Sequence, residues 1–295
     1  MKNLVMFAGA CLLLASCSSD NADDLPDIPD VPAVSDLTLN LDGLEDLGSD
    51  FLYEGWIIVD GAPISTGTFS VSDTGELSQS SFSMDAATLD SATNFVLTIE
   101  PVPDPAPGPA DTKLLIGDFS GNSATVSTGT VAESFANIAG EYILATPTGT
   151  GAAEEEFSGI WFLDNSSGSP MVGLELPTLS DGWKYEGWAV IDGAAVTTGT
   201  FTSVTGEDDA ATFSGANPSP PFPGEDFLVN APDGLTFPTD LRNGVAVISI
   251  EPYPDNSPAP FTLKPLVGMV PADAMGVQAM NDNVSGSFPS GSVSR

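Results

Sequence analysis

The stretch YEGWIIVDGAPISTGTF, from Tyr53 to Phe69, decides the fold, because the chain repeats it as YEGWAVIDGAAVTTGTF from Tyr185 to Phe201. Eleven of the 17 positions are identical, and most of the others exchange similar residues. Self-similarity of this kind indicates a structural unit that the sequence encodes twice.

Each copy has the composition of a β-hairpin. The run from Trp56 to Val59 is aromatic or β-branched, which favours a strand, and both of its faces are apolar, which favours a strand covered on both sides. Asp60 and Gly61 then form the Asp-Gly pair that is typical of a two-residue hairpin turn. The second copy has the same pair at Asp192 and Gly193. We therefore expect two equivalent hairpins.

A glycine lies inside the return strand of each hairpin, at Gly67 and Gly199. Glycine within a strand usually marks a bulge or the close approach of a bulky neighbour. The expected neighbours are Trp56 in the first copy and Trp188 in the second.

A second phrase is also repeated. Phe95 to Pro101 is FVLTIEP, and Ala246 to Pro252 is AVISIEP. Prolines follow both phrases, and further downstream Lys113 to Gly117 (KLLIG) matches Lys264 to Gly268 (KPLVG). Each copy therefore contains a tryptophan hairpin, an Ile-Glu-Pro strand, a proline-rich loop and a further strand.

Short apolar runs separated by glycine and proline predict an all-β fold. We expect two tandem antiparallel β-sandwich modules of the immunoglobulin or fibronectin kind, spanning residues 37–165 and 171–288. The second copy lacks counterparts of LATPT and GIWF, which close the first. It is therefore expected to lack an edge strand or to borrow one from the first module, and the Ser/Gly-rich tail from Val284 is expected to fray.

The charge is strongly negative, with 41 acidic residues against 6 basic ones and a formal net charge of −35. Nucleic acid is excluded as a partner, because phosphate contacts need clusters of Lys and Arg. Three explanations remain open: a surface that resists association, adaptation to high salt, and binding of divalent cations.

The chain has no histidine, and its two cysteines are Cys11 and Cys17, both near the N-terminus. Serine–histidine triads and imidazole-ligated zinc are therefore excluded within this chain. The body of the chain can contain neither a disulfide nor a thiolate metal site. We expect no cofactor, and the sequence names no metal site.

Residues 1–17 have the pattern of a secretion signal, with Lys2 before an apolar run. The run ends in Leu14-Ala15-Ser16-Cys17, which resembles the lipobox of bacterial lipoproteins. An ordinary signal peptide with a chance cysteine is the alternative. A lipid on Cys17 would anchor the protein to a membrane at the cell envelope, facing the periplasm or the exterior. Residues 18–36, rich in Asp and Pro, are expected to form a disordered tether.

The repeated phrases resemble the extracytoplasmic C-terminal domain of anti-sigma-K factors. The residues that carry the resemblance are Tyr53, Trp56, Asp60, Gly67, Phe69, Glu100 and Pro101, and again Tyr185, Trp188, Asp192, Gly199, Phe201, Glu251 and Pro252. The resemblance implies an outward-facing β-sandwich used for sensing or for protein contact. The cytoplasmic zinc-ligand part and the transmembrane helix of that family have no counterpart in this chain.

Four glutamates recur in the two copies: Glu54 with Glu186, and Glu100 with Glu251. Such carboxylates could bind a cation or form a glycosidase-like pair. The favoured interpretation is structural, with each carboxylate paired to a backbone amide or to Lys113 or Lys264.

The four tryptophans divide into two groups. Trp56 and Trp188 lie in the repeated phrase and are expected in the core, although stacking on a sugar ring is an alternative. Trp161 and Trp183 lie outside the phrase and are the expected surface aromatics.

The sequence thus predicts a non-enzymatic, lipid-anchored protein that binds or senses an envelope protein or an extracellular ligand. One alternative is a regulatory component of an anti-sigma-factor pathway. Another is a cation-stabilised adhesin. A hydrolase that uses only carboxylates ranks last.

Overall fold

The computed structural model describes residues 33–254 and 257–295, and these residues form an all-β structure, as the sequence predicts. The predicted signal peptide of residues 1–17, with Cys17, lies outside the described residues, as does most of the predicted tether. Strand β1 begins at Val34, so residues 34–36 belong to the sheet and not to the tether. No helix within the described ranges is long and apolar enough to cross a bilayer.

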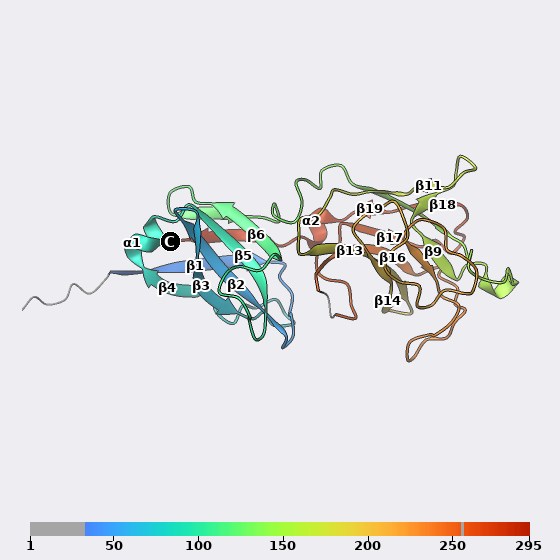
Figure 1. Cartoon of the computed structure of the whole chain (residues 1–295), viewed down its shortest axis with the longest axis horizontal. Helices are drawn as coiled ribbons and strands as arrows, with labels where there is room; N and C mark the ends of the chain where they lie inside the picture. Colours follow the sequence, from blue (N-terminus) through green and yellow to red (C-terminus); the bar gives the residue numbers. More distant parts are fainter. Residues whose placement is uncertain (1–32, 255–256) are drawn as a thin grey trace, which may run out of the picture. The chain divides into compact units, whose positions relative to one another are not determined.

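Eight strands form a first sandwich from two four-stranded sheets, ordered β3-β2-β5-β6 and β4-β1-β20-β7 (Figure 1). The strands are β1 (Val34–Asp42), β2 (Phe51–Val59), β3 (Ala62–Phe69), β4 (Ser81–Asp85), β5 (Asn94–Pro101), β6 (Lys113–Asp118), β7 (Ser123–Val126) and β20 (Ser290–Ser294). The short helix α1 (Ala86–Asp90) follows β4, and the Asp85 carboxylate caps it by accepting from the Thr88 N–H.

The second sandwich has sheets ordered β14-β13-β16-β17-β19 and β12-β8-β9-β15, with β18 also paired to β8. Its strands are β8 (Ala139–Leu144), β9 (Gly159–Trp161), β12 (Leu174–Glu175), β13 (Trp183–Ile191), β14 (Ala194–Phe201), β15 (Gly224–Asp226), β16 (Val245–Pro252), β17 (Leu266–Met269), β18 (Val277–Ala279) and β19 (Asn281–Asp282). A separate ribbon pairs β10 (Leu163–Asp164) with β11 (Met171–Val172), and the short helical segments η1 (Ala153–Glu155) and α2 (Val284–Ser287) complete the described elements.

Both predicted hairpins form, and they are equivalent. Val59 faces Ala62 across the first turn, and Ile191 faces Ala194 across the second. Asp60 and Gly61 both have positive φ, at 51° and 79°, and Asp192 and Gly193 repeat this at 51° and 86°. Positive φ at both turn positions is the conformation for which an Asp-Gly pair is suited.

The return strands bulge where the sequence placed a glycine. In the first hairpin Gly55 pairs with Gly67 but Trp56 pairs with Ser65, so one residue is extra. The expectation of a tryptophan beside the glycine is wrong. The ring of Phe82 lies 3.0 Å from the Cβ position of Gly67, because β4 of the facing sheet crosses there.

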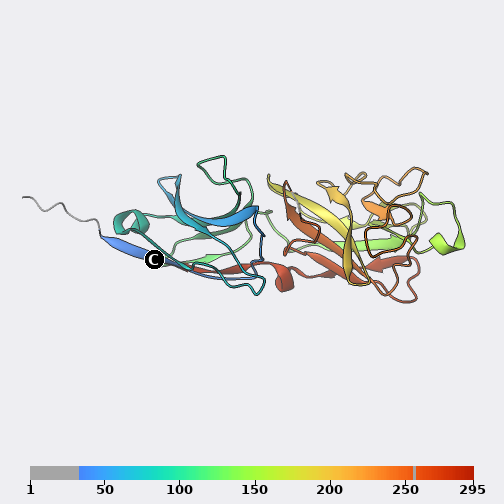
Figure 2. The ribbon, with the colours of Figure 1, turned by 90° about the horizontal axis from the view of Figure 1, so that it is seen from below.

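The strand pairing cuts across the boundaries that the sequence suggested. The strands β8 and β9, expected in module 37–165, pair with strands of the second sandwich. This sandwich therefore takes strands from the first predicted module, and they occupy the middle of its sheet. The tail expected to fray is also ordered, because β20 lies between β1 and β7 of the first sandwich (Figures 1 and 2). The two sandwiches are thus not simply consecutive segments of the chain.

Candidate functional site

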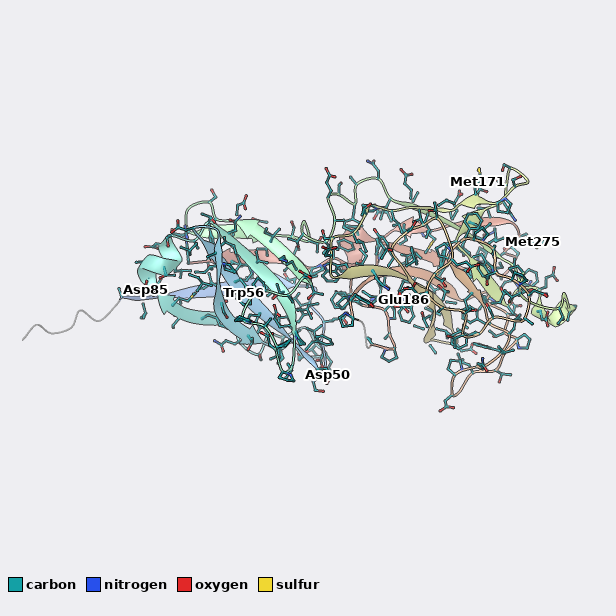
Figure 3. The ribbon with its side chains drawn as sticks, viewed as in Figure 1. Asp50, Trp56, Asp85, Met171, Glu186 and Met275 are labelled. Atoms are coloured by element: carbon teal, nitrogen blue, oxygen red, sulfur yellow. The ribbon has the colours of Figure 1, made fainter. Side chains whose placement is uncertain are left out.

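The repeated tryptophans and glutamates lie on the outer face of each hairpin sheet. Side chains alternate between the two faces of a strand. On β2, Tyr53 and Ile57 belong to the main hydrophobic core, which places Glu54 and Trp56 on the opposite face. Both are nevertheless buried, with exposed fractions of 8% for Glu54 and 3% for Trp56. The strand is therefore covered on both sides, as its sequence predicts. Figure 3 labels Trp56 in the first sandwich and Glu186 in the second.

A chain of hydrogen bonds runs across this outer face in the first sandwich. The Trp56 indole N–H donates to the Thr98 hydroxyl over 2.9 Å, and this hydroxyl donates to the Glu100 carboxylate over 2.5 Å. The same carboxylate accepts the backbone N–H of Ala110 over 2.8 Å. Burial raises the pKa of Glu100 above its ordinary value, and these hydrogen bonds oppose the rise. We call this chain of groups the relay.

The second sandwich repeats the relay with equivalent residues. The Trp188 indole donates to the Ser249 hydroxyl over 2.7 Å, and Ser249 donates to the Glu251 carboxylate. The carboxylate accepts the backbone N–H of Phe261 over 2.9 Å. In both sandwiches the amide that completes the relay belongs to the proline-rich loop, so the relay fixes this loop over the outer face of its sheet.

The other pair of repeated glutamates binds the return strand. Ser65 donates to the carboxylate of Glu54, and Thr197 donates to that of Glu186, in each case across the hairpin. Among the described residues, Lys113 forms its ion pair with Asp111 at 4.0 Å and not with a repeated glutamate. Glu100 and Glu251 each accept a backbone amide, one of the partners that the sequence suggested, and Glu251 also interacts electrostatically with Lys264. For Glu54 and Glu186 the structure adds a hydroxyl donor that the sequence analysis did not suggest.

The repeated tyrosines are also equivalent. The Tyr53 hydroxyl donates to the Glu45 carbonyl over 3.0 Å, and the Tyr185 hydroxyl donates to the Pro177 carbonyl over 2.7 Å, in each case eight residues earlier. Each ring stacks on the phenylalanine that ends the phrase, Phe69 or Phe201, with 5.6 Å between ring centroids. Burial raises the pKa of both phenols.

A third tryptophan–carboxylate pair lies in the facing sheet of the second sandwich. The Trp161 indole donates to Asp226 over 2.7 Å, and the backbone N–H of Thr148 donates to the same carboxylate over 2.8 Å. Trp161 and Trp183 are only 1% and 3% exposed, so the expectation that they are surface aromatics is wrong. Trp183 is two residues before Tyr185 on β13, and this spacing places it on the core face.

Asp208 has the most unusual acidity outside the repeats. Its carboxylate accepts the backbone N–H groups of Gly224, over 2.8 Å, and of Ala210, over 3.2 Å. Burial raises the pKa of Asp208 to about 7, and the nearby charges of Glu225 and Asp209 add to the effect. Burial also raises the pKa of Glu225 and of Asp226.

These acidic side chains are engaged with hydroxyl and amide donors. Within residues 33–254 and 257–295, no three acidic, histidine or cysteine side chains are grouped to hold a metal ion. The repeated indoles are buried and therefore have no face available for stacking on a sugar. On the outer faces, Glu100 and Glu251 fix the proline-rich loops, and Glu54 and Glu186 hold the return strands of the hairpins.

The loops that the relays fix present apolar side chains at equivalent positions. Val102 follows Pro101 and is 47% exposed, and Tyr253 follows Pro252 and is 54% exposed. The ammonium group of Lys184 lies 4.3 Å from the centroid of the Tyr253 ring, and it also forms an ion pair with Asp209 at 2.6 Å. A restrained aromatic ring beside a cation is a typical component of a binding surface.

Two residues of the relays escaped the sequence analysis, namely Thr98 and Ser249. A signal for them exists, because both repeated phrases carry a hydroxyl residue two positions before the glutamate, in TIE and in SIE. That spacing places the hydroxyl and the carboxylate on the same face of one strand.

Comparisons with protein-family models, curated proteins and solved structures found no match to this chain. The resemblance to the anti-sigma-K domain therefore stays a prediction from the repeated motifs.

Proposed function

We propose that this chain is a non-enzymatic, lipid-anchored protein of the cell envelope that binds a protein or another extracellular ligand through its proline-rich loops. The observation that carries the proposal is the pair of equivalent relays. Each relay uses a repeated carboxylate to hold a loop whose exposed side chain, Val102 or Tyr253, points away from the core. Binding residues are commonly placed on loops held by a rigid scaffold.

The lipobox-like sequence supports the anchor. Substitution Cys17→Ser should move the protein from the detergent-extracted membrane fraction to the soluble fraction, because it removes the residue that would carry the lipid. An unchanged distribution would argue against lipidation at this residue.

Affinity capture from detergent-solubilised envelopes tests the binding surface. The wild-type chain should retain a partner that the double variant Val102→Ala, Tyr253→Ala loses. The control variant Met275→Ala removes a 74% exposed side chain from another part of the surface and should retain the partner. Equal capture by the wild type, the double variant and the control would show that the proline-rich loops do not bind the partner.

The identity of the partner then separates the alternatives. A sigma-factor regulator among the captured proteins would specify a regulatory role. Capture that requires calcium would specify an adhesin. Hydrolysis that is lost on Glu54→Gln or Glu186→Gln would overturn the non-enzymatic proposal.

A further inference from the structure

In each sandwich, four strands of the sheet that faces the hairpin sheet correspond in order, and β12 of the second sandwich has no counterpart in the first. The order β4-β1-β20-β7 in the first matches the order β15-β9-β8-β18 in the second. The strands β4 and β15 each lie between the hairpin and the Ile-Glu-Pro strand in the sequence, and β7 and β18 each come after the strand that follows the proline-rich loop. The remaining strands then correspond as β1 to β9 and β20 to β8.

The correspondence of β20 with β8 shows that each of these strands pairs in a different sandwich from the strands that precede it in the chain. The strand β8 follows β7 of the first sandwich in the sequence, but it pairs within the second sandwich. The strand β20 likewise follows β18 and β19 of the second sandwich, but it pairs within the first. Each therefore leaves the sandwich that precedes it and completes another one.

We propose that β20 is a donated strand, and that the acceptor between β1 and β7 also takes β20 from a second copy of this chain. Two copies that exchange β20 reciprocally form a closed dimer, whereas donation from each copy to the next joins the copies head to tail. Such heterologous contacts close into rings or extend into open chains.

The groove between β1 and β7 that accepts β20 is specific for this strand. Residues of β20 pair with β1 on one side, from Asp42 to Thr38, and with β7 on the other, from Val126 to Ser123. Val293 is fully buried between them. A Cβ at Gly291 would lie 2.2 Å from the Asn40 carbonyl oxygen, so the site requires glycine there. Without β20, two strands would expose unpaired edges, which recruit another strand.

Arg295 adds a second recognition element after the strand. Its guanidinium donates to the carbonyl oxygens of Leu89 over 2.6 Å, Ala92 over 2.7 Å and Gly121 over 3.1 Å. It also lies 4.4 Å from the centroid of the Phe119 ring. Hydrogen bonds from a charged donor are stronger than neutral ones. These carbonyl oxygens and the Phe119 ring therefore form a specific binding site for the guanidinium of Arg295, which follows the donated strand.

The connection to β20 is short and contacts the other connection between the sandwiches. Residues 283–289 join β19 to β20 and contain α2. Phe288 in this segment packs edge-on against Phe135, with 4.9 Å between centroids, and Phe135 belongs to the connection from β7 to β8. Ser287 and Asn283 of this segment also hydrogen-bond to Lys264, so release of β20 requires these contacts to open together with the aromatic one. Short connecting loops favour strand exchange.

Cross-linking between two different chains tests the proposal. Thr38 and Ser294 are exposed and face each other across β1 and β20, at a spacing compatible with a disulfide. In the full-length chain, kept in mild detergent, Cys11 and Cys17 are replaced by serine, so that the introduced thiols are the only ones. Chains with Thr38→Cys are mixed with chains that carry Ser294→Cys and are oxidised after incubation.

The proposal expects a disulfide-linked heterodimer whose yield rises with protein concentration. The doubly substituted chain shows that the pair is competent, because it should form the bond within one molecule. The matched control mixes Asn94→Cys and Asp118→Cys chains, which face each other on β5 and β6, strands that are not exchanged. A heterodimer yield no higher than that of this control would overturn the proposal.

A competition experiment identifies the site of exchange. A synthetic peptide of residues 288–295, added in excess, should occupy the acceptor and reduce the heterodimer yield several-fold. The same peptide with Val293→Asp should not, because it would bury an unpaired charge. If neither peptide changes the yield, the cross-link does not pass through the acceptor and the proposal fails.

Discussion

The hydroxyl groups of Thr98 and Ser249 connect the tryptophan of each repeat to its glutamate. Each accepts one hydrogen bond and donates another inside a buried region. A buried polar group that loses its partner costs more than the hydrogen bond itself contributes, because it cannot recover its hydration. The relays are therefore places where a change of one atom should have a large effect.

Thr98→Val keeps the shape of the side chain and removes the hydroxyl. It should lower the free energy of unfolding by about 2–4 kcal/mol, because the Trp56 indole and the Glu100 carboxylate both lose a partner. Urea unfolding followed by tryptophan fluorescence measures the change. The control Thr68→Val lies on the exposed side of β3 and should cost less than about 0.5 kcal/mol. Equal costs at the two positions would contradict the relay.

Asp208 makes the stability depend on pH near neutrality. Its folded-state pKa, about 7, is above the ordinary value of 3.8, so the folded protein holds this proton more tightly than the unfolded chain. The stabilisation is complete below the ordinary pKa and is lost as the pH rises through about 7. The melting temperature should therefore fall between pH 5.5 and pH 8.

The variant Asp208→Asn should reduce this pH dependence by about 1–2 kcal/mol in the free energy of unfolding. Asp240→Asn is the matched control. The hydrogen bond from Arg242 holds the pKa of Asp240 below its ordinary value, so that group does not titrate in this range, and its charge is not among those that raise the pKa of Asp208. If both variants keep the wild-type pH profile, Asp208 is not the group responsible.

At the scale of elements, the hairpin turns depend on backbone conformation alone. Gly61 has a φ of +79°, and a Cβ there would meet no other atom within 4 Å. Gly61→Ala should therefore cost about 1–2 kcal/mol through the left-handed backbone conformation and not through a clash. Gly61→Asn should cost less, because asparagine tolerates this conformation. Thermal unfolding of the two variants tests the order, and a larger loss for Asn would contradict it.

The elements that the sequence predicted correctly are those whose causes are local. The Asp-Gly turns, the bulges at Gly67 and Gly199 and the burial of both faces of β2 follow from residues close together in the chain. The residue beside Gly67 was mispredicted because Phe82 reaches it from another strand. Local patterns specify a strand but not the sheet that receives it.

The destinations of β8, β9 and β20 could not be predicted for the same reason. Their sequences, AGEYIL, GIW and SGSVS, indicate strands or a polar tail but do not indicate which strands they pair with. The repeated phrases also gave the wrong boundary between the two modules. The strands β8 and β20 occupy equivalent places but differ in sequence, so the repeats did not reveal them. Equivalent positions in a fold need a compatible shape more than identical residues.

For the whole molecule, the main destabilising interaction is repulsion among the acidic side chains. Ion pairs in the described residues include Lys113–Asp111, Lys184–Asp209 and Arg242–Asp240, but the full chain has only 6 basic residues against 41 acidic ones. The acidic excess is therefore not compensated by pairing within the described ranges. Such self-repulsion destabilises a folded state and weakens when salt screens it.

Salt should therefore stabilise the fold without a specific ion site. The Debye length falls from about 30 Å at 0.01 M to about 3 Å at 1 M, so the urea midpoint should rise steadily with NaCl over this range. CaCl2 at matched ionic strength should give a similar curve if screening is the cause. A steep rise at low millimolar Ca2+ would instead indicate cation binding, and a midpoint independent of NaCl would show that the acidic surface carries no folding penalty. Near-UV circular dichroism at low salt supplies the structural reading of the same titration, because retained signal at 0.01 M NaCl excludes a fold that depends on high salt.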